Sequence, residues 1–335
     1  MRTTTTTKWN NEEQAAVHAV RAASAVCQVI QKRLVRPETL EKKDKSPVTV
    51  ADFASQAVVC AHLIEAFPRD LMIGEEDAAE LREEAQAQVR RTVVEHVGTA
   101  LRRPVSDDDV LSWIDHGASV AAVATRSRRY WTLDPIDGTK GFLRAGQYAV
   151  ALALIEDGQV VLGVLGCPNF PINGSTGALL VASRGNGARI TPLADPSADG
   201  LPLRVSPLKD SAHLRFCESV ESGHSDQDQS AKIARLLKIT TPPLRMDSQA
   251  KYAAVARGDA HVYLRLPTRA DYQEKIWDHA AGFLVVEEAG GRVSDITGKP
   301  LDFSHGATLA SNRGVVATTG GIHHNVIQAI RGSAV

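Results

Sequence analysis

The 335-residue sequence has few cysteines, few aromatic residues and almost no net charge, and these shortages exclude several classes of protein. Its four cysteines, Cys27, Cys60, Cys167 and Cys217, stand alone without a CxxC pair, which argues against a thiolate zinc site and a disulfide scaffold. The net charge of −1 gives no general attraction to a nucleic-acid polymer or an anionic membrane. A reduced, cytoplasmic protein is the simplest interpretation, with targeting to an organelle left open.

Long apolar runs are also missing from the sequence. We find no run near the roughly 18 residues that span a bilayer. Residues 1–9 carry a threonine run in place of the apolar core of a signal peptide. We therefore expect a disordered tail over 1–9 and no membrane partner. Hydrophobic residues at 43% and charged residues at 23% are typical of a globular protein, and the length allows two lobes.

Apolar spacing predicts helices in the first part of the chain and a β-hairpin in the middle. Helical periodicity indicates one helix over 11–30 and a second that begins near Asp52 and ends before Pro68. Two apolar runs, 148–155 and 160–167, are joined by a short Glu-Asp-Gly-Gln turn, which is typical of a hairpin.

The second part of the chain predicts alternating strands and helices after a connector. Residues 192–207 are rich in proline, aspartate and serine, which favours a link between two lobes. Strands are expected at 213–220 and 260–264, and helices at 226–237, 248–257 and 277–289. We therefore expect layered α/β (α+β) structure, with an N-terminal lobe over 10–190 and a C-terminal lobe over 205–335.

Acidic residues gather at several places that a turn or an apolar segment could hold rigid. They are Asp52, Gly74-Glu75-Glu76-Asp77, the pair Asp134 and Asp137, and Asp278. Pro135 fixes one backbone angle between the paired aspartates, and Gly138 permits a tight turn after them. Such a turn can aim both carboxylates, and a carbonyl between them, at one point.

These carboxylates favour a magnesium site. Packed carboxylates repel one another, and a hard cation with oxygen ligands relieves that repulsion. Metal ions in such a site can activate a water molecule and stabilise a leaving oxygen. Thr139 could hydrogen-bond that water, and Asp52 could accept its proton. Taken alone, however, each cluster is more typical of an ordinary turn, a charged loop or a solvated helix face.

Three of these motifs, taken in order, resemble one enzyme superfamily. Gly74-Glu75-Glu76 is followed by Asp134-Pro135-Ile136-Asp137-Gly138-Thr139 and, much later, by Trp277-Asp278-His279-Ala280-Ala281-Gly282. This order resembles the lithium-sensitive, magnesium-dependent phosphatase superfamily that includes inositol monophosphatase. The resemblance implies a layered αβαβα sandwich in two lobes.

The residues after the aspartate turn narrow the resemblance. Lys140-Gly141 stands where inositol monophosphatases typically have Thr-Asn, and this variant looks like the 3′(2′),5′-bisphosphate nucleotidases of fungi and plants. The segments 44–52, 147–155, 166–169, 247–252 and 262–267 also look like that group. In all, the resemblance covers about residues 10 to 332.

The resemblance implies a role for each matching residue. The metal ligands it implies are the carboxylates of Glu75, Asp134, Asp137 and Asp278 and the carbonyl of Ile136, holding two or three Mg²⁺ ions. It implies that Asp52 and Thr139 orient and activate the attacking water.

The substrate implied by the resemblance is a small nucleotide. Adenosine 3′,5′-bisphosphate would lose its 3′-phosphate to give AMP and phosphate, and 3′-phosphoadenosine 5′-phosphosulfate is often accepted as well. The implied substrate-binding residues are Gly138, Thr139, His224, Ser248, Lys251, Arg265 and Asp278. One departure concerns Asp226 and Gln227, which stand where relatives often carry Ser and His.

Two other functions stay open from the sequence. An inositol polyphosphate 1-phosphatase is the alternative within the enzyme class, although Lys140-Gly141 and the segment with Ser248 and Lys251 favour the nucleotide. A catalytically silent nucleotide-binding sensor is the alternative outside it. The full carboxylate set, with Asp52 and Thr139, argues against a sensor. We expect a monomer that binds neither a nucleic-acid polymer nor a membrane.

Overall fold

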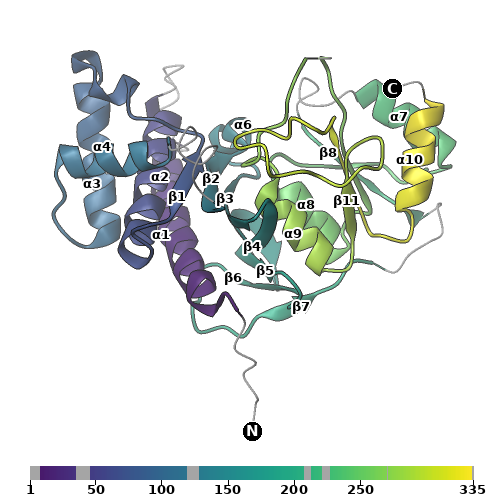
Figure 1. The fold of residues 1–335 in the computed structure, drawn as a ribbon, viewed down its shortest axis with the longest axis horizontal. Helices are drawn as coiled ribbons and strands as arrows, with labels where there is room; N and C mark the ends of the chain where they lie inside the picture. The colour runs from purple at the N-terminus through teal and green to yellow at the C-terminus, as the bar shows by residue number, and fades with distance from the viewer. Residues whose placement is uncertain are drawn as a thin grey trace, which may run out of the picture.

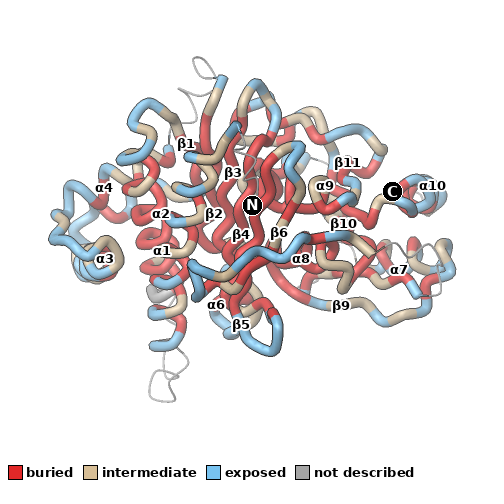
Figure 2. The backbone as a smooth tube through the Cα atoms, turned by 90° about the horizontal axis from the view of Figure 1, so that it is seen from below, coloured by how far each residue is buried: buried red, intermediate tan, exposed pale blue. Residues whose placement is uncertain are grey.

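The computed structural model describes residues 8–34, 46–118, 128–206, 213–220, 227–269 and 271–333. Their helices and strands stack in alternating layers, in the order helix, sheet, helix, sheet, helix (Figure 1). The predicted αβαβα sandwich is therefore confirmed. Buried backbone concentrates in the strands and in the helices that lie between and beside the sheets (Figure 2).

The first sheet has seven strands that lie side by side in sequence order. They are β1 (Leu71–Gly74), β2 (Arg129–Asp137), β3 (Ala149–Glu156), β4 (Gln159–Ile172), β5 (Ser175–Ser183), β6 (Ala188–Pro192) and β7 (Leu201–Leu203). β1 pairs with β2 in parallel, and the other pairings are antiparallel. β3 and β4 form the predicted hairpin, and β7 arises within the segment predicted as a connector.

Helices cover both faces of this sheet, which explains why β3 is apolar and buried at seven consecutive positions, 149–155. α1 (Asn10–Leu34) and α2 (Ser46–Ala66) pack on one face. α8 (Ala250–Arg257) and α9 (Ala280–Glu288) pack on the other face. Because α8 and α9 come from the second half of the chain, the division into lobes 10–190 and 205–335 stays a prediction.

The second sheet has five strands, in the order β11-β12-β10-β8-β9. They are β8 (Phe216–Glu218), β9 (Leu244–Arg245), β10 (Val262–Arg265), β11 (Arg292–Ser294) and β12 (Val315–Thr318). α8 and α9 separate this sheet from the first one. α7 (Gln227–Leu236) and α10 (His323–Gly332) cover its outer face through a separate apolar core that includes Phe216, Ile233 and Val326.

Within the charged segment 78–128, residues 78–118 form a helical extension against α2. It contains the short 3-10 helices η2 (Glu80–Arg82) and η3 (Glu84–Gln86), then α3 (Ala87–Leu101) and α4 (Asp107–His116). Ser106 begins α4 with a capping box, because its hydroxyl accepts from the Asp109 N–H while the Asp109 carboxylate accepts from the Ser106 N–H. Residues 119–127 lie outside the described residues.

Three sequence expectations need correction. α2 begins at Ser46, well before Asp52, and α9 begins at Ala280, three residues after the predicted start. The predicted tail is too long, because Lys8 at its end donates a 3.1 Å hydrogen bond to Glu156. Within the described residues, one helical stretch, Val48–Ala66, is long and apolar enough to cross a membrane, although 78% of that window is buried in the protein. Polar residues interrupt this stretch, so it contains no continuous apolar run of the length that spans a bilayer. Its burial is that of a core helix in a soluble α/β domain.

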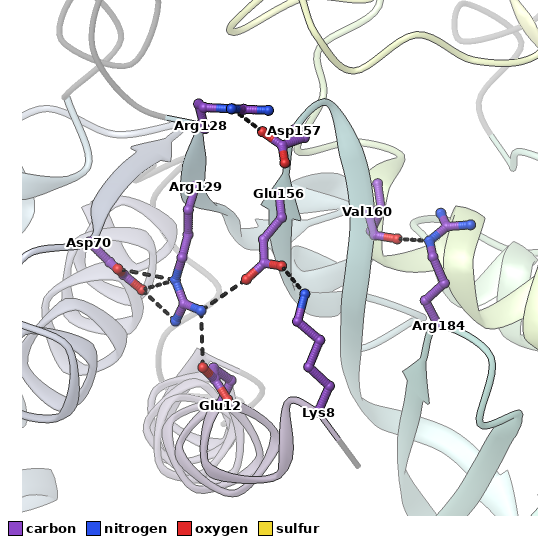
Figure 3. Close-up of polar contacts among 9 residues, drawn as sticks. All are labelled: Lys8, Glu12, Asp70, Arg128, Arg129, Glu156, Asp157, Val160 and Arg184. Carbon is purple, nitrogen blue, oxygen red and sulfur yellow. Dashed lines mark hydrogen bonds and ion pairs between the residues drawn. The ribbon is translucent and has the colours of Figure 1, made fainter.

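An ion-pair network closes the end of the first sheet at which β2 begins (Figure 3). The Arg129 guanidinium donates to Asp70 at 2.9 Å, to Glu12 at 3.0 Å and to Glu156 at 3.0 Å. These partners belong to the loop before β1, to α1 and to β3. Arg129 therefore joins three segments at this end of β2. The acidic turn lies at the opposite end of the same strand.

Candidate functional site

The parallel pairing of β1 and β2 brings two acidic segments to one edge of the first sheet. Glu75 directly follows β1. Asp134 lies near the end of β2, and Asp137 is its last residue. The register of β2 against β3 shifts between Asp134 and Asp137, so the strand bulges at this point. Gly138 then takes a left-handed conformation at φ +90° and turns the chain into α6 (Thr139–Leu143).

The second half of the chain supplies the facing wall. Asp278 lies two residues before α9, Ser248 lies two residues before α8, Lys251 is in the first turn of α8, and Arg265 ends β10. Together the two walls enclose a cavity of about 300 Å³. The sequence-predicted residues that line it are Glu75, Asp134, Ile136, Asp137, Gly138, Thr139, Ser248, Lys251, Arg265 and Asp278.

Two predicted residues lie elsewhere. Asp52 is buried in α2 and is not among the residues that line the cavity, although the charges of Glu76 and Glu75 reach it. His224, like Asp226, lies outside the described residues. Ser248 also differs from expectation, since it precedes the helix at φ +68° and does not share a helix face with Lys251.

The carboxylates of the cavity destabilise one another. Asp134 is only 2% exposed, and burial together with the charges of Glu75, Asp137 and Asp278 raises its pKa well above the ordinary value. Burial raises the pKa of Asp278 to about 6, with Asp137 adding to the shift and His279 opposing it. Desolvation, then Asp278, Glu76 and Asp137, raise the pKa of Glu75 to about 8, although its solvent exposure screens part of this effect.

The same groups fit a divalent cation bound through oxygen. Among the described residues, the Oδ1 atom of Asp134 is buried without a hydrogen-bond partner. A buried carboxylate oxygen without a partner is costly unless a cation or donor meets it. The donors around it are carboxylates and a backbone carbonyl, which are the ligands that Mg²⁺ and Ca²⁺ prefer. A bound cation would therefore remove both the repulsion and the unsatisfied oxygen.

Comparison with known proteins places the chain in a family. The model of the inositol monophosphatase family matches residues 11–333. The chain belongs to the inositol monophosphatase family. A Schizosaccharomyces pombe protein named 3′(2′),5′-bisphosphate nucleotidase is 45% identical over 335 residues, covering 95% of this chain and 94% of that protein. An Oryza sativa protein of the same name is 42% identical and covers 96% and 93% of the two chains. The family resemblance predicted from the sequence is confirmed.

Solved structures of the inositol monophosphatase family share the fold. The inositol monophosphatase from Zymomonas mobilis superposes with a TM-score of 0.64 at 19% identity, covering 97% of this chain and 99% of that one. The inositol monophosphatase from Anabaena gives a TM-score of 0.61 at 21% identity and covers 97% of both chains. At this level of identity the likeness concerns the layered fold alone.

One further group of possible metal ligands overlaps the acidic cavity. Glu274, Asp278 and His279 bring ligand atoms within 4.8 Å of one another. Glu274, however, already accepts a 3.1 Å hydrogen bond from His279 Nε2 and pairs with Arg265 at 3.3 Å. The other ring nitrogen of His279 lies 2.7 Å from the Tyr252 hydroxyl. We therefore assign Glu274 and His279 to the structural support of the cavity.

Sequence reasoning missed several residues that line or support the cavity. Three residues that line the cavity were predicted only as members of the segments 247–252 and 262–267, without a role of their own. They are Asp247, Gln249 and Tyr263. Asp247 is 5% exposed and forms a 2.7 Å ion pair with Arg144, just after α6. The signal available for Asp247 and Gln249 was their position on either side of Ser248. These two residues contact partners more than a hundred residues away, so local patterns do not reveal them.

The buried Lys251 has more than one neighbour in the cavity. It is 4% exposed, and burial lowers its pKa while the carboxylate of Asp137 raises it. In turn, Lys251 is the largest of the influences that offset the effect of burial on the pKa of Asp137. Its ammonium also lies 5.3 Å from the ring centre of Tyr263. Lys251 thus interacts electrostatically with Asp137 on the facing wall and with Tyr263 on its own side of the cavity.

Proposed function

We propose that this chain is a 3′(2′),5′-bisphosphate nucleotidase that converts adenosine 3′,5′-bisphosphate to AMP and phosphate. The main support is identity of 45% with a nucleotidase of that name over nearly the full length of both chains. The cavity supports the same conclusion, because a wall of carboxylates faces a wall with Lys251 and Arg265. Such a site can hold metal ions at the phosphate to be cleaved and cations at a phosphate to be retained. The sulfated relative, 3′-phosphoadenosine 5′-phosphosulfate, is a second proposed substrate.

The proposed metal is Mg²⁺, with two or three ions bound. Its ligands would be the carboxylates of Glu75, Asp134, Asp137 and Asp278 and the carbonyl of Ile136. When bound, the metal supplies positive charge that acidifies water and stabilises the oxygen released from phosphorus.

The protein's own residues would handle the water and its proton. Thr139 is exposed at the start of α6 and lines the cavity, so its hydroxyl can orient a water molecule. The water oxygen bonds to the 3′-phosphorus as the bond from phosphorus to the ribose 3′-oxygen breaks. Because Asp52 does not line the cavity, the proton that the water loses would reach it through the Thr139 hydroxyl, and solvent supplies the proton of the new 3′-hydroxyl. Burial and the charges of Glu76 and Glu75 raise the pKa of Asp52, so its ionised form is a stronger proton acceptor than an exposed carboxylate.

The nucleotide would lie against the second half of the chain. Ser248, Lys251 and Arg265 offer a hydroxyl and two cations to the retained 5′-phosphate and the sugar. Gly138, Thr139 and Asp278 would contact the leaving phosphate side, and His224 completes the proposed set.

Three broader proposals accompany this activity. We propose lobes over 10–190 and 205–335, because the strands of the second sheet all lie within 205–335 and those of the first sheet lie within 10–190 except for β7 and the end of β6. The four cysteines are free and buried, which supports a reducing compartment such as the cytoplasm. We also propose that the protein works as a monomer.

Phosphate release from three substrates tests the proposal. We would compare adenosine 3′,5′-bisphosphate, inositol 1,4-bisphosphate and inositol 1-phosphate, each with Mg²⁺ and with a chelator. The nucleotide should turn over fastest and only with metal. Faster turnover of an inositol phosphate would show an inositol phosphatase, and no turnover of any substrate would favour a sensor.

A matched pair of variants tests the acidic turn. Asp137→Asn should abolish phosphate release while preserving the unfolding midpoint, because it removes one ligand charge without changing side-chain size. Asp195→Asn, in an exposed loop after β6, should leave the rate unchanged. An active Asp137→Asn protein would contradict the ligand assignment.

A further inference from the structure

Gln249 connects segments on both walls of the cavity, with its side chain on one wall and its backbone on the other. It is 1% exposed, so its amide must find partners within the protein. Its Nε2 donates a 2.8 Å hydrogen bond to the carbonyl of Trp277, the residue before Asp278. Its Oε1 accepts a 3.0 Å hydrogen bond from the N–H of Gly282 in the first turn of α9. The amide therefore spans the turn that carries Asp278.

The backbone of the same residue reaches the other wall. The Gln249 N–H donates a hydrogen bond to Oδ2 of Asp137, at the end of β2. One residue thus holds a carboxylate of the first half of the chain and the turn of a carboxylate of the second half. Asp137 and Asp278 come from different elements, and the hydrogen bonds of Gln249 link Asp137 to the turn that carries Asp278.

The residue before Gln249 joins the same assembly. Ser248 sits in the left-handed conformation at φ +68°, and its hydroxyl accepts a 3.1 Å hydrogen bond from the Ala250 N–H. Ser248 also packs against Gly138, where an added Cβ would lie only 2.8 Å from the Ser248 Cβ. A shift of Gln249 would therefore move Ser248 as well, against a neighbour that leaves no free space.

We propose that Gln249 is a positioning residue that holds Asp137 and Asp278 in register with each other and with Ser248. This inference rests on the proposed function for the role of the two carboxylates as metal ligands. The direct partners of metal ligands commonly affect metal affinity by about 10- to 100-fold. Gln249 is such a partner for Asp137 through its backbone and for Asp278 through the turn that precedes α9.

Gln249→Met tests the proposal, because it keeps the length of the side chain and removes both hydrogen bonds of the side-chain amide. We expect the half-saturating Mg²⁺ concentration for phosphate release to rise by about tenfold or more. The dissociation constant of Mn²⁺, measured without substrate by the paramagnetic resonance of the free ion, should rise similarly. The rate at saturating Mg²⁺ should recover substantially, because added metal compensates for weaker binding. Gln249→Asn keeps the amide but cannot reach both partners, so it should shift both constants in the same direction.

Gln31→Met is the matched control for a purely structural loss. Gln31 is also buried, donates to the Phe142 carbonyl at 2.8 Å and accepts from Asn169 at 3.3 Å, but does not line the cavity. It should lower the unfolding midpoint and leave both metal constants unchanged. Equal metal constants in folded Gln249→Asn or Gln249→Met and the wild-type chain would overturn the proposal. So would an equal shift in Gln31→Met. If the wild-type chain binds Mn²⁺ but does not hydrolyse the nucleotide, the proposed function fails while the Mn²⁺ comparison still tests Gln249.

Discussion

Replacing Gly138 by alanine should damage both the stability and the activity of the protein. Gly138 follows the acidic turn at φ +90°, where a residue with a Cβ pays roughly 1–2 kcal/mol for the left-handed conformation. The added Cβ would lie 2.8 Å from the Cβ of Ser248 and 3.2 Å from the carbonyl oxygen of Gln147. Such overpacking typically costs roughly 1–3 kcal/mol more. The two effects together predict a loss of roughly 2–5 kcal/mol of unfolding free energy.

Gly174→Ala separates these two effects. Gly174 lies in the turn between β4 and β5 at φ +76°, and none of the described residues comes within 4 Å of the position that an added Cβ would take. Its replacement should cost only the conformational term, roughly 1–2 kcal/mol. Urea unfolding of both variants measures the difference, which reports the contact between Gly138 and Ser248.

Phosphate release provides the second measurement. Relief of the clash at Gly138 must move either Ser248 or the backbone between Asp137 and Thr139, and displacements of about 1 Å at a reacting centre can cost about 100-fold in rate. Gly138→Ala should therefore lose about 100-fold, and Gly174→Ala should retain the wild-type rate. Equal unfolding free energies for the two variants, with full activity in both, would refute the reasoning.

Three further predictions concern charge. In a chelator, the unfolding midpoint should fall from pH 5 to pH 8, because native Asp278 and Glu75, with pKa values raised to about 6 and about 8, keep protons that the unfolded chain has released. Saturating Mg²⁺ should remove this trend, and a midpoint that rises with pH in the chelator would contradict it. Lys251→Met should raise the KM for adenosine 3′,5′-bisphosphate by roughly 10- to 100-fold, which corresponds to the free energy of one hydrogen bond to a charged group. Steady-state kinetics would check this, with Lys232→Met on α7 as the control. Arg129→Met should lower the unfolding free energy, measured in urea, by about 1–3 kcal/mol. It should not change kcat, because the network in Figure 3 lies at the end of β2 opposite the acidic turn. A fall in kcat would argue against the independence of the two ends.

The sequence alone was sufficient for the local features of the fold. The hairpin of β3 and β4 followed from two continuous apolar runs and an Asp-Gly turn, because apolar runs and turn chemistry are local properties of a few residues. The aspartate turn at 134–139 was recognisable for the same reason. Helix starts were less accurate, since α2 begins several residues before Asp52 and α9 begins after Asp278. Local spacing marks where a helix is apolar, whereas tertiary contacts decide where it begins.

Only the tertiary structure decided how the acidic residues are arranged. The sequence determined which carboxylates are present and which family pattern they follow, but it could not show that Asp134 is buried in the cavity lining or that Asp52 is absent from that lining. It also could not reveal Gln249, whose partners lie 28, 33 and 112 residues away. Hydrogen bonds of this kind depend on the packing of α8 and α9 between two sheets. The physical reason is that a site between two halves of a chain is set by long-range contacts, which short sequence patterns do not encode.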